Sequence, residues 1–370
     1  MRIVTVFGTR PEAIKMAPVI RALRGSNGVE SIVCSTGQHR EMLLPILDLF
    51  EIEPAYDLDV LVAGQNLNAL FARTLTRVGD LLEETKPDRI LVHGDTTTAS
   101  ASALAAFHQG IPVSHVEAGL RTRNMHEPWP EEFNRRVVDL VSDQLFAPTE
   151  KARLNLVEEH LGSSQIYVTG NTVIDALLQT RDRLREDEDF TDIISRQFPE
   201  LDATKKLVLV TGHRRENFGP AFKEMTLALR DIAERPDVQI IYPVHLNPNV
   251  QKPVYETLAH LPNVFLRPPL DYPAFVYLMN RATLVISDSG GVQEEAPSLG
   301  KLVLVTRNVT ERPEALEAGT VELVGTERER IVGRCFFYLE NPDALAKIAT
   351  IKNPYGDGHA AQRILKEIVK

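Results

Sequence analysis

Short apolar runs alternate along the chain with longer segments that have helical spacing. In the first half these runs lie at residues 3–7, 31–35, 89–93, 111–116, 144–146 and 166–169, and in the second half at 207–211, 239–243, 264–267, 284–287 and 302–306. Runs of this length are typical of strands buried in a parallel sheet, and the segments between them, such as 66–85, are typical of amphipathic helices. The pattern predicts an α/β fold in which two Rossmann-like, doubly wound domains face a central cleft.

The pattern is interrupted between residues 179 and 205, where the chain becomes strongly charged (RDRLREDEDF). We interpret this segment as an irregular connection between domains, with a charged helix as the alternative. We therefore expect an N-terminal domain over residues 1–175 and a C-terminal domain over residues 176–355. A final amphipathic helix within residues 356–370 is expected to pack back toward the N-terminal domain.

Residues 93–136 carry several acids directly after predicted strands. The runs 89–93 and 111–116 flank an alanine-rich helical segment, which is the pattern of a right-handed βαβ unit. Because parallel strands end at the same edge of a sheet, Asp95 and Glu117 should face one crevice. Glu131 begins the next predicted helix, and Arg135 lies one turn later on the same face. These three acids and one guanidinium indicate a reaction centre.

Several of these residues have simpler interpretations. Asp95 could cap the helix that follows it, whereas Glu117, at a strand end before Ala-Gly, is costly unless it is solvated or functional. His93 and His115 suggest a metal ion, but both lie in predicted buried strands and form no recognised zinc geometry, so we expect no metal. We expect Trp129 to be a packing anchor rather than a platform for a sugar ring.

Two strand-to-helix loops in different halves of the chain have features of phosphate sites. Residues 8–11 (Gly-Thr-Arg-Pro) open a predicted helix, where the N-terminus with Arg10 and Lys15 could bind a phosphate. The alternative is an ordinary tight turn with a surface lysine. Residues 288–291 (Asp-Ser-Gly-Gly) open another helix, and their glycines would let a diphosphate approach the backbone. Neither loop matches the dinucleotide or P-loop consensus.

Further polar residues are expected near the loop at residues 288–291. Some are close to it in sequence, and others follow a strand at the same predicted sheet edge. Glu295, one turn inside the helix, could bind ribose hydroxyls, although a capped helix with solvated glutamates is the alternative. His213, with Arg214 and Arg215, follows the first strand of the second half and could contact phosphate. The residues thus suggest a nucleotide-diphosphate ligand and acid/base chemistry, and they leave the bond and the sugar open.

Composition narrows the function classes. The 370 residues carry 41 basic and 51 acidic side chains, a formal net charge of -10. An acidic chain without a basic run offers no broad surface for nucleic acid or an anionic membrane. Cys34 and Cys335 have no CxxC spacing, which argues against a disulfide framework or a structural zinc. The sequence begins directly in a predicted strand and contains no 18-residue apolar run, so we expect a cytoplasmic enzyme.

Several motifs resemble the non-hydrolysing UDP-N-acetylglucosamine 2-epimerases, in order from residue 1 to about residue 365. They are VFGTRPEAIKMAP, TGQHREML, LVHGDTTT, HVEAGLRT, VTGHRREN and NPYGDG. The resemblance implies a fold like that of GT-B glycosyltransferases, a homodimer, no cofactor, and a role in cell-surface polysaccharide biosynthesis. It also implies reversible conversion of UDP-GlcNAc to UDP-ManNAc. In that reaction UDP leaves C1 as the C2 proton is removed, and it adds back to 2-acetamidoglucal.

The resemblance also assigns roles, residue by residue. The acid/base residues are Asp95, Glu117 and Glu131, with no division of labour among them. Four residues are expected to hold the diphosphate or its developing charge: Arg10, Lys15, Arg135 and His213. Of these, His213 is expected to be a catalytic residue. The residues expected around phosphate, ribose and uracil are Phe275, Ser289, Gly290, Gly291, Glu295 and Arg312.

Some members of this family also bind UDP-GlcNAc at a regulatory site. Gln38, His39 and Arg40 match the loop involved, but Glu41 stands where some members carry glutamine. Activation by UDP-GlcNAc is therefore an open hypothesis. Three alternative functions also remain: a hydrolysing epimerase that releases N-acetylmannosamine and UDP, a GT-B glycosyltransferase, and a non-catalytic UDP-sugar sensor.

Overall fold

Two parallel sheets organise the chain, each within its own compact unit. The computed structural model describes residues 1–38, 40–161, 165–214 and 217–370, and it leaves the side chains of residues 40–42 undescribed. The first unit comprises Met1–Ala176 and Tyr355–Lys370, and the second comprises Leu177–Pro354. The C-terminal segment thus belongs to the first unit.

The first unit contains a seven-stranded parallel sheet with the order β3-β2-β1-β4-β5-β6-β7. Its strands are β1 (Arg2–Phe7), β2 (Glu30–Ser35), β3 (Tyr56–Asp57), β4 (Arg89–His93), β5 (Val113–Val116), β6 (Gln144–Ala147) and β7 (Gln165–Val168). The central strand β1 pairs with both β2 and β4. The strand order reverses there, and ligands of open α/β sheets bind at such a switch point, beside the loops after β1 and β4.

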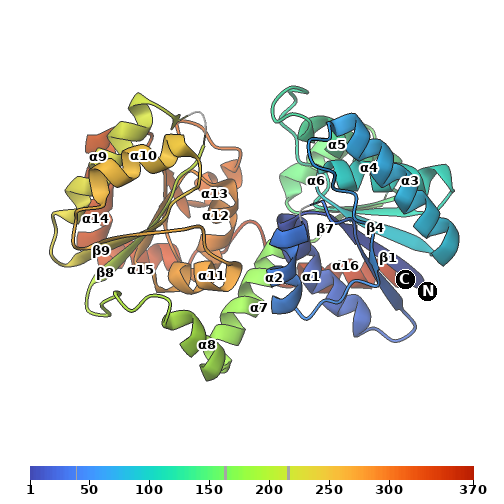
Figure 1. The fold of residues 1–370 in the computed structure, drawn as a ribbon, viewed down its shortest axis with the longest axis horizontal. Coiled ribbons are helices and arrows are strands. Elements are labelled where there is room, and N and C mark those ends of the chain that lie inside the picture. The colour runs from blue at the N-terminus through green and yellow to red at the C-terminus, as the bar shows by residue number, and fades with distance from the viewer. Residues whose placement is uncertain (39, 162–164, 215–216) are drawn as a thin grey trace. The chain divides into compact units, whose positions relative to one another are not determined.

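Helices cover both faces of this sheet (Figure 1). They are α1 (Arg10–Arg24), α2 (Arg40–Leu49), α3 (Leu67–Thr85), α4 (Thr97–His108), α5 (Glu131–Val141), α6 (Glu150–Glu158), the start of α7 (Thr172–Glu186) and α16 (Ala360–Ile368). Helices α3, α4 and α5 pack side by side on one face, whereas α16 packs against α1 on the other. The Asp175 carboxylate accepts hydrogen bonds from the backbone N–H groups of Ala360 and Ala361, and these bonds anchor the start of α16.

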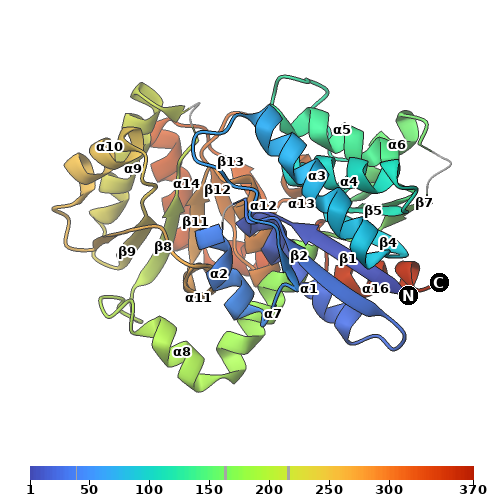
Figure 2. The ribbon, with the colours of Figure 1, turned by 45° about the vertical axis from the view of Figure 1, so that its right-hand side comes forward.

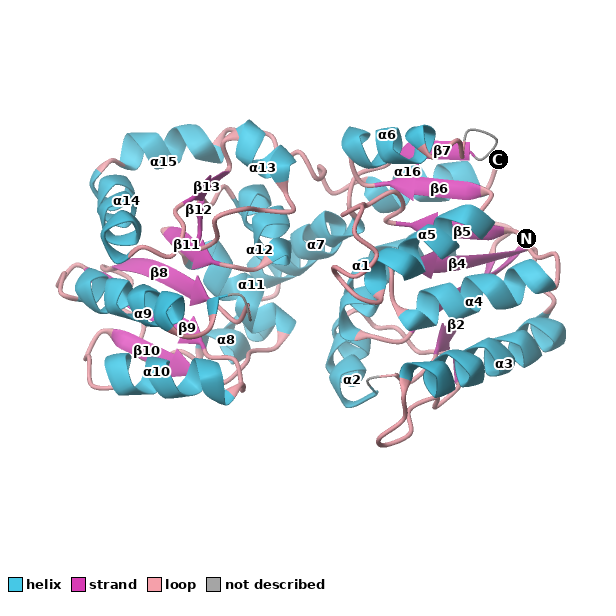
Figure 3. Ribbon diagram, turned by 90° about the horizontal axis from the view of Figure 1, so that it is seen from above, coloured by secondary structure: helices cyan, strands magenta, loops and turns pink. Residues whose placement is uncertain are grey.

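The second unit contains a six-stranded parallel sheet with the order β10-β9-β8-β11-β12-β13. Its strands are β8 (Lys206–Thr211), β9 (Val238–Pro243), β10 (Val264–Arg267), β11 (Leu284–Ser287), β12 (Val303–Val305) and β13 (Val321–Leu323). Figure 3 shows the strands of this sheet running in one direction, in agreement with their parallel pairing. The switch point lies between β8 and β11, so the loops after these two strands form the corresponding ligand-binding edge.

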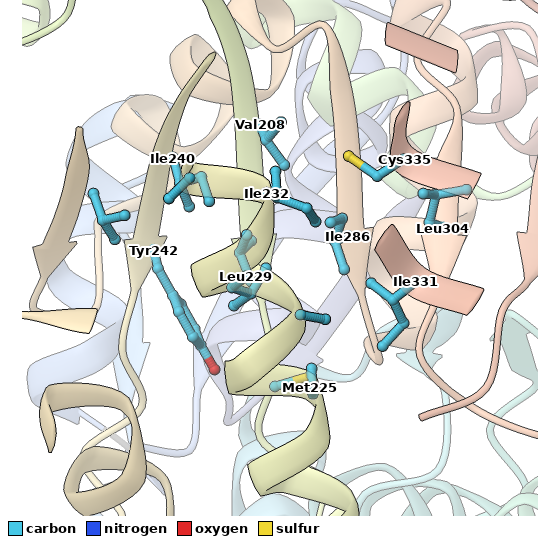
Figure 4. Close-up of a cluster of buried hydrophobic side chains, with 14 of the residues drawn as sticks. Val208, Met225, Leu229, Ile232, Ile240, Tyr242, Ile286, Leu304, Ile331 and Cys335 are labelled. Carbon is cyan, nitrogen blue, oxygen red and sulfur yellow. The ribbon is translucent and has the colours of Figure 1, made fainter. Parts of the chain in front are cut away.

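The helices of the second unit follow its strands in turn. They are α8 (Glu188–Ser195), α9 (Pro220–Ala233), α10 (Pro248–Leu258), α11 (Tyr272–Arg281), α12 (Gly290–Glu295), the 3₁₀ helix Ala296–Leu299, α13 (Pro313–Ala318), α14 (Arg328–Glu340) and α15 (Pro342–Ala349). Helices α9 and α10 lie next to each other beside β8 and β9 (Figure 2). Figure 4 shows Leu229 and Ile232 of α9 meeting Ile286 of β11 and Ile331 of α14 in the buried core.

The predicted strands agree with the observed ones to within about two residues, but two short strands were not predicted. These are β3 and β13, whose two and three residues are too few to show periodicity. The prediction of an irregular segment at 179–205 is wrong for most of its length, because α7 and α8 cover much of it. The charged-helix alternative is correct there, and Asp187 caps α8 by accepting from the Phe190 N–H.

Two further predictions about side chains and membranes can be compared with the structure. Trp129 is 64% exposed, so it is not the expected packing anchor. It lies in a loop whose residues 122–129 are all exposed. Within the described part of the chain, no helix has the length and apolar character needed to cross a membrane.

Candidate active site

Glu117 has a strained backbone at the end of β5. Its φ angle is +70°, a left-handed conformation that a non-glycine residue rarely adopts. The N–H groups of Glu117 and Ala118 both donate to the carbonyl oxygen of Phe146, at 3.1 Å each. The neighbouring strand β6 thus holds the strained turn in place. Strain of this kind persists where the surroundings enforce it, and it is concentrated at functional sites.

Among the described residues, those that bind the carboxylate of Glu117 all do so through the same oxygen. Oε2 forms an ion pair with Lys15 Nζ and accepts a hydrogen bond of 3.0 Å from the Asn171 side chain. His93 Nε2 lies 3.7 Å from the same oxygen, which is too long for a hydrogen bond. No donor from the described residues reaches Oε1, which lies beside the backbone of Gly94. Oε1 is therefore the oxygen that can react.

The charges around Glu117 fix its protonation state. Burial alone would raise the pKa of this carboxyl group, but Lys15 and His93 beside it lower the pKa well below its ordinary value. Glu117 is consequently ionised at neutral pH. Lys15 was expected to hold a diphosphate, but in the structure its ammonium group pairs with this carboxylate.

Asp95 lies at the end of the neighbouring strand β4, and it does not cap α4. The cap is Thr96, whose hydroxyl accepts from the Ala99 N–H at 3.0 Å, so the capping interpretation of Asp95 is wrong. Instead, Asp95 Oδ2 accepts from Nε of Arg135 at 3.1 Å and from the Nη2 group of the same guanidinium. The side chain of Asn134 donates to the Asp95 carbonyl at 3.0 Å, which fixes the backbone as well.

The partners of Arg135 include an acid that the sequence did not single out. Its second contact is Glu132 at 3.2 Å, not Glu131, although both acids lie within one helical turn. Glu132 is fully buried and accepts from the backbone N–H groups of Thr122 and Arg123. Nothing in the sequence distinguished it from its neighbour Glu131.

Glu131 occupies a different environment from Glu132. Its Oε2 atom is buried, and none of the described residues donates a hydrogen bond to it. A buried carboxylate oxygen without a donor is costly. Glu131 therefore presents an acceptor, or a proton site, that a bound molecule could satisfy.

The loop after β1 is hydrogen-bonded to its own helix. Glu12 forms a capping box: its Oε2 accepts from the N–H groups of Gly8 (3.0 Å) and Thr9 (2.8 Å). Its Oε1 accepts from the Thr96 hydroxyl at 2.6 Å, and this bond joins the loops after β1 and β4. The loop N–H groups that were expected to bind phosphate are therefore occupied, and Arg10 is exposed at the helix start.

The corresponding loops of the second unit are also joined by a buried acid. Asp288, fully buried after β11, accepts from the backbone N–H groups of His213 (2.9 Å) and Arg214 (2.9 Å). Its Oδ2 also lies 3.4 Å from the side-chain nitrogen of Asn217. Asp288 therefore positions the loop after β8 beside the start of α12, and His213 lies at this edge.

The start of α12 is a candidate site for an anion. Ser289 makes no side-chain cap there, and a Cβ atom added at Gly290 would lie 3.5 Å from an Arg312 guanidinium nitrogen and 3.7 Å from one of Arg214. Two cations thus adjoin backbone N–H groups at a helix N-terminus, which is a favourable arrangement for a diphosphate. Arg312 is itself oriented by an ion pair with Glu294. The structure therefore places Gly290 close to Arg312, and Ser289 next to Gly291, while their role in binding phosphate stays a prediction.

Glu295 and Phe275 lie on elements next to this anion site. The Tyr272 hydroxyl donates to Glu295 Oε1 at 3.0 Å, and Glu295 Oε2 lies 3.9 Å from the Cβ position of Gly291. Burial, together with Glu295, raises the pKa of Tyr272 well above its ordinary value, so the hydroxyl keeps its proton. Phe275, half-buried, is on the same helix as Tyr272.

His213 is held as a neutral ring. Its side chain stacks on His245 with centroids 5.5 Å apart and lies 3.5 Å from Asp288. Burial lowers the pKa of His213 below its ordinary value; Asp288 opposes this shift, while His245 and Arg214 add to it. Arg215, the remaining cation expected here, lies outside the described residues.

The residues expected to form a regulatory site are only partly visible. Gln38 Oε1 accepts a hydrogen bond of 2.7 Å from the Thr98 hydroxyl. His39 and the side chain of Arg40 lie outside the described residues. The regulatory hypothesis therefore stays a prediction.

The fold and the two edges together define a class of protein. This is an α/β protein of two Rossmann-like domains, with an acid-lined edge in the first unit and a glycine- and arginine-lined anion site in the second. The predicted α/β fold class is confirmed.

Comparison with known proteins identifies the family. The family model for UDP-N-acetylglucosamine 2-epimerase matches residues 21–369. The chain is 53% identical over 369 residues to the UDP-N-acetylglucosamine 2-epimerase of Yersinia pestis, covering 100% of this chain and 98% of that protein. The chain belongs to the UDP-N-acetylglucosamine 2-epimerase family, and the family predicted from the motifs is confirmed.

Two solved structures of the family resemble this chain over its whole length. The UDP-GlcNAc 2-epimerase from Neisseria meningitidis, bound to UDP-GlcNAc, is 48% identical with a TM-score of 0.91 and full coverage of both chains. The enzyme from Methanocaldococcus jannaschii, in complex with UDP-GlcNAc and UDP, is 33% identical with a TM-score of 0.81. That match covers 100% of this chain and 99% of the other.

Proposed function

We propose that this chain interconverts UDP-GlcNAc and UDP-ManNAc by eliminating UDP to give 2-acetamidoglucal and adding it back. The observation that carries this proposal is the state of Glu117. It is ionised and strained, and the described residues bind it through Oε2, so that Oε1 is available as a base. Family membership and the ligands bound to the two relatives support the choice of substrate.

The chemistry requires a base that acts together with a leaving group. The C2–H bond has no adjacent carbonyl, so a base alone does not remove the proton. In the proposed step Glu117 Oε1 takes the proton from C2, the C1–O bond to UDP breaks with its electron pair, and a C1=C2 double bond forms. Return of a proton to the other face of C2 and re-addition of UDP at C1 give the epimer. A positioned base of this kind typically contributes about 10²–10⁴ in rate.

Asp95 and Glu131 are the other two candidates for handling protons and charge. Asp95 is anchored by Arg135, which suits a carboxylate that stabilises positive charge developing on the sugar ring. Glu131 has a buried oxygen without a donor from the described residues, which suits a group that holds or returns a proton. We propose this division of labour, with Glu117 as the base for UDP-GlcNAc.

The second unit supplies groups for UDP. We propose that the diphosphate binds at Ser289, Gly290 and Gly291, where Arg312 and Arg214 neutralise its charge. The neutral His213 ring, at the same edge, can donate a hydrogen bond to the departing phosphate. The remaining assignments are Glu295 for the ribose hydroxyls and Phe275 for the uracil ring.

NMR spectroscopy of the products formed from UDP-GlcNAc tests this function. The proposal predicts a mixture of UDP-GlcNAc and UDP-ManNAc that reaches a constant ratio, without accumulation of UDP. The alternative, a hydrolysing epimerase, would release free N-acetylmannosamine and UDP in equal amounts. A transferase or a sugar sensor would leave UDP-GlcNAc alone unchanged.

We further propose that the chain acts as a homodimer in the cytoplasm, supplying activated sugar for cell-surface polysaccharides. Support for self-association comes from α5, where Phe133 and Leu140 lie two turns apart and are 49% and 70% exposed. Apolar side chains exposed in this way favour coverage by a partner. Light scattering tests the dimer: the unchanged chain should have twice the monomer mass, and Leu140→Glu should shift it toward the monomer.

Regulation by UDP-GlcNAc is a separate part of the proposal. It rests on the match of residues 38–40 to the loop used by some family members. The reverse reaction tests it, because activation predicts that UDP-ManNAc turns over only when some UDP-GlcNAc is present. A hyperbolic response to UDP-ManNAc alone would contradict it.

A further inference from the structure

We propose that His115 is an imidazolium paired with Asp139, and that this buried pair positions the two turns that carry Asp95 and Glu117. His115 is thus a positioning residue rather than a catalytic one, since its ring is fully buried and its two nitrogens contact Asp139 and the Gly94 carbonyl. This inference deepens the proposed function and rests on it.

The hydrogen bonds of the His115 ring require a proton on both nitrogens. Nε2 lies 2.8 Å from the carbonyl oxygen of Gly94, which can only accept, so Nε2 carries a proton. Nδ1 lies 2.6 Å from Asp139 Oδ1. The other Asp139 oxygen faces an Arg121 guanidinium nitrogen at 2.7 Å and the Gly119 N–H at 3.3 Å. A guanidinium at this distance keeps a buried carboxylate ionised, so Oδ1 can only accept and Nδ1 carries a proton as well.

The charges around the pair agree with this assignment. Burial would raise the pKa of Asp139, but His115 and Arg121 lower it below its ordinary value. Arg121 also forms a two-pronged ion pair with Glu159, at 2.8 and 2.7 Å, and Glu159 lies 3.7 Å from Arg136 at the surface. The fully buried Asp139 carboxylate therefore lies between the His115 ring and the Arg121 guanidinium, whose side chains are 0% and 1% exposed.

The pair connects directly to the candidate active site. His115 lies on β5 two residues before Glu117, and its ring reaches the carbonyl of Gly94, the residue before Asp95. Gly94 has a φ of +64°, and its N–H donates to the Val116 carbonyl at 2.9 Å. The His115 bond therefore fixes the Gly94–Asp95 peptide against the strand that carries Glu117. A displacement of about 1 Å in such a group can cost about 100-fold in rate.

The protonation state can be measured in the unchanged protein. In ¹⁵N-histidine-labelled chain, long-range ¹H–¹⁵N spectra distinguish rings with two N–H groups from neutral rings. Among the 10 histidines, we expect one buried ring that shows an N–H group on each nitrogen at neutral pH. Asp139→Asn removes the counter-charge, so the signals of this ring should change to those of a ring with a single N–H group. A wild-type spectrum in which the ring that responds to Asp139→Asn has only one N–H group would overturn the proposal.

Kinetics test the positioning role. His115→Gln should lower kcat for UDP-GlcNAc about 100-fold with little change in KM or in the affinity for UDP. His108→Gln is the matched control, because His108 is exposed at the end of α4 in the same unit. Wild-type kcat in a folded His115→Gln variant would contradict the role. An inactive wild-type chain would instead contradict the proposed function. The NMR spectrum of the wild-type chain does not depend on its activity or on the folding of any variant.

Discussion

Lys15 forms an ion pair with Glu117 through the carboxylate oxygen Oε2. Asn171 donates to the same oxygen, so one side of the carboxylate is held and the other is left for chemistry. The ammonium group also keeps the buried acid ionised, because it counteracts the effect of burial on the pKa. Lys15 thereby controls when Glu117 can act as a base.

Removal of the Lys15 charge should shift the pH dependence of activity. In Lys15→Met, burial is less opposed and the pKa of Glu117 rises. A base must be ionised to accept a proton. As the pH is lowered, the variant should therefore lose activity at a higher pH than the wild type does. The acidic limb of a kcat/KM profile measures this shift. Lys15→Arg retains the charge and is the control, and a Lys15→Met profile with an unmoved acidic limb would contradict the assignment.

Neutral replacements of the two acids at the strand ends should strongly reduce turnover while UDP binding remains. Glu117→Gln removes the base, and Asp95→Asn removes the carboxylate anchored by Arg135. Each should lower kcat by about 10²–10⁴. Isothermal titration with UDP should give nearly unchanged affinity, since the groups proposed for UDP lie in the second unit. Near-normal activity of either variant would show that its acid is not required.

A methyl group at Gly290 should weaken UDP binding without disturbing the fold. The nearest atom to the added Cβ is an Arg312 nitrogen at 3.5 Å, which is an ordinary contact, so the methyl group fits but occupies the space proposed for phosphate. We expect Gly290→Ala to lower UDP affinity about tenfold, about 1.4 kcal/mol. Gly333→Ala is the control, because no atom lies within 4 Å of its added Cβ. Equal UDP affinity in both variants would argue against the diphosphate site.

Loss of the Glu12 carboxylate should destabilise the first unit. It accepts hydrogen bonds from the Gly8 and Thr9 backbone and from the Thr96 hydroxyl, all in a buried site. Glu12→Ala leaves these donors unpaired and should lower the free energy of unfolding by about 3 kcal/mol. Thermal unfolding followed by circular dichroism measures the effect. Glu83→Ala, at an exposed position of α3, should change stability by less than about 0.5 kcal/mol.

The sequence predicted the fold well where an element was long enough to show a period. The buried runs that became β1, β4, β8 and β9 were each at least five residues long. The short strand β13 gave no such signal. The charged segment after residue 179 was misread because local charge does not separate a solvated helix from a linker, as α7 and α8 demonstrate.

The sequence predicted which residues belong to the candidate site better than it predicted the contacts between them. The position of Glu117 at a strand end followed from the βαβ pattern, but its ion pair with Lys15 joins residues 102 positions apart. The same holds for Glu12, whose bond to Thr96 spans 84 positions. Asp139 looked like any helix acid, and only the fold brings it to His115. Contacts of this kind depend on tertiary packing, which periodicity and spacing do not encode.

The most direct test of the account follows the hydrogen at C2 of the sugar. UDP-GlcNAc is incubated with the chain in D₂O, and the recovered nucleotide sugars are examined by NMR and mass spectrometry. If Glu117 removes the C2 proton and a solvent-exchanged proton returns, both UDP-ManNAc and recovered UDP-GlcNAc should carry deuterium at C2, and the Glu117→Gln variant should incorporate none. Formation of UDP-ManNAc that retains its original C2 hydrogen would contradict the account.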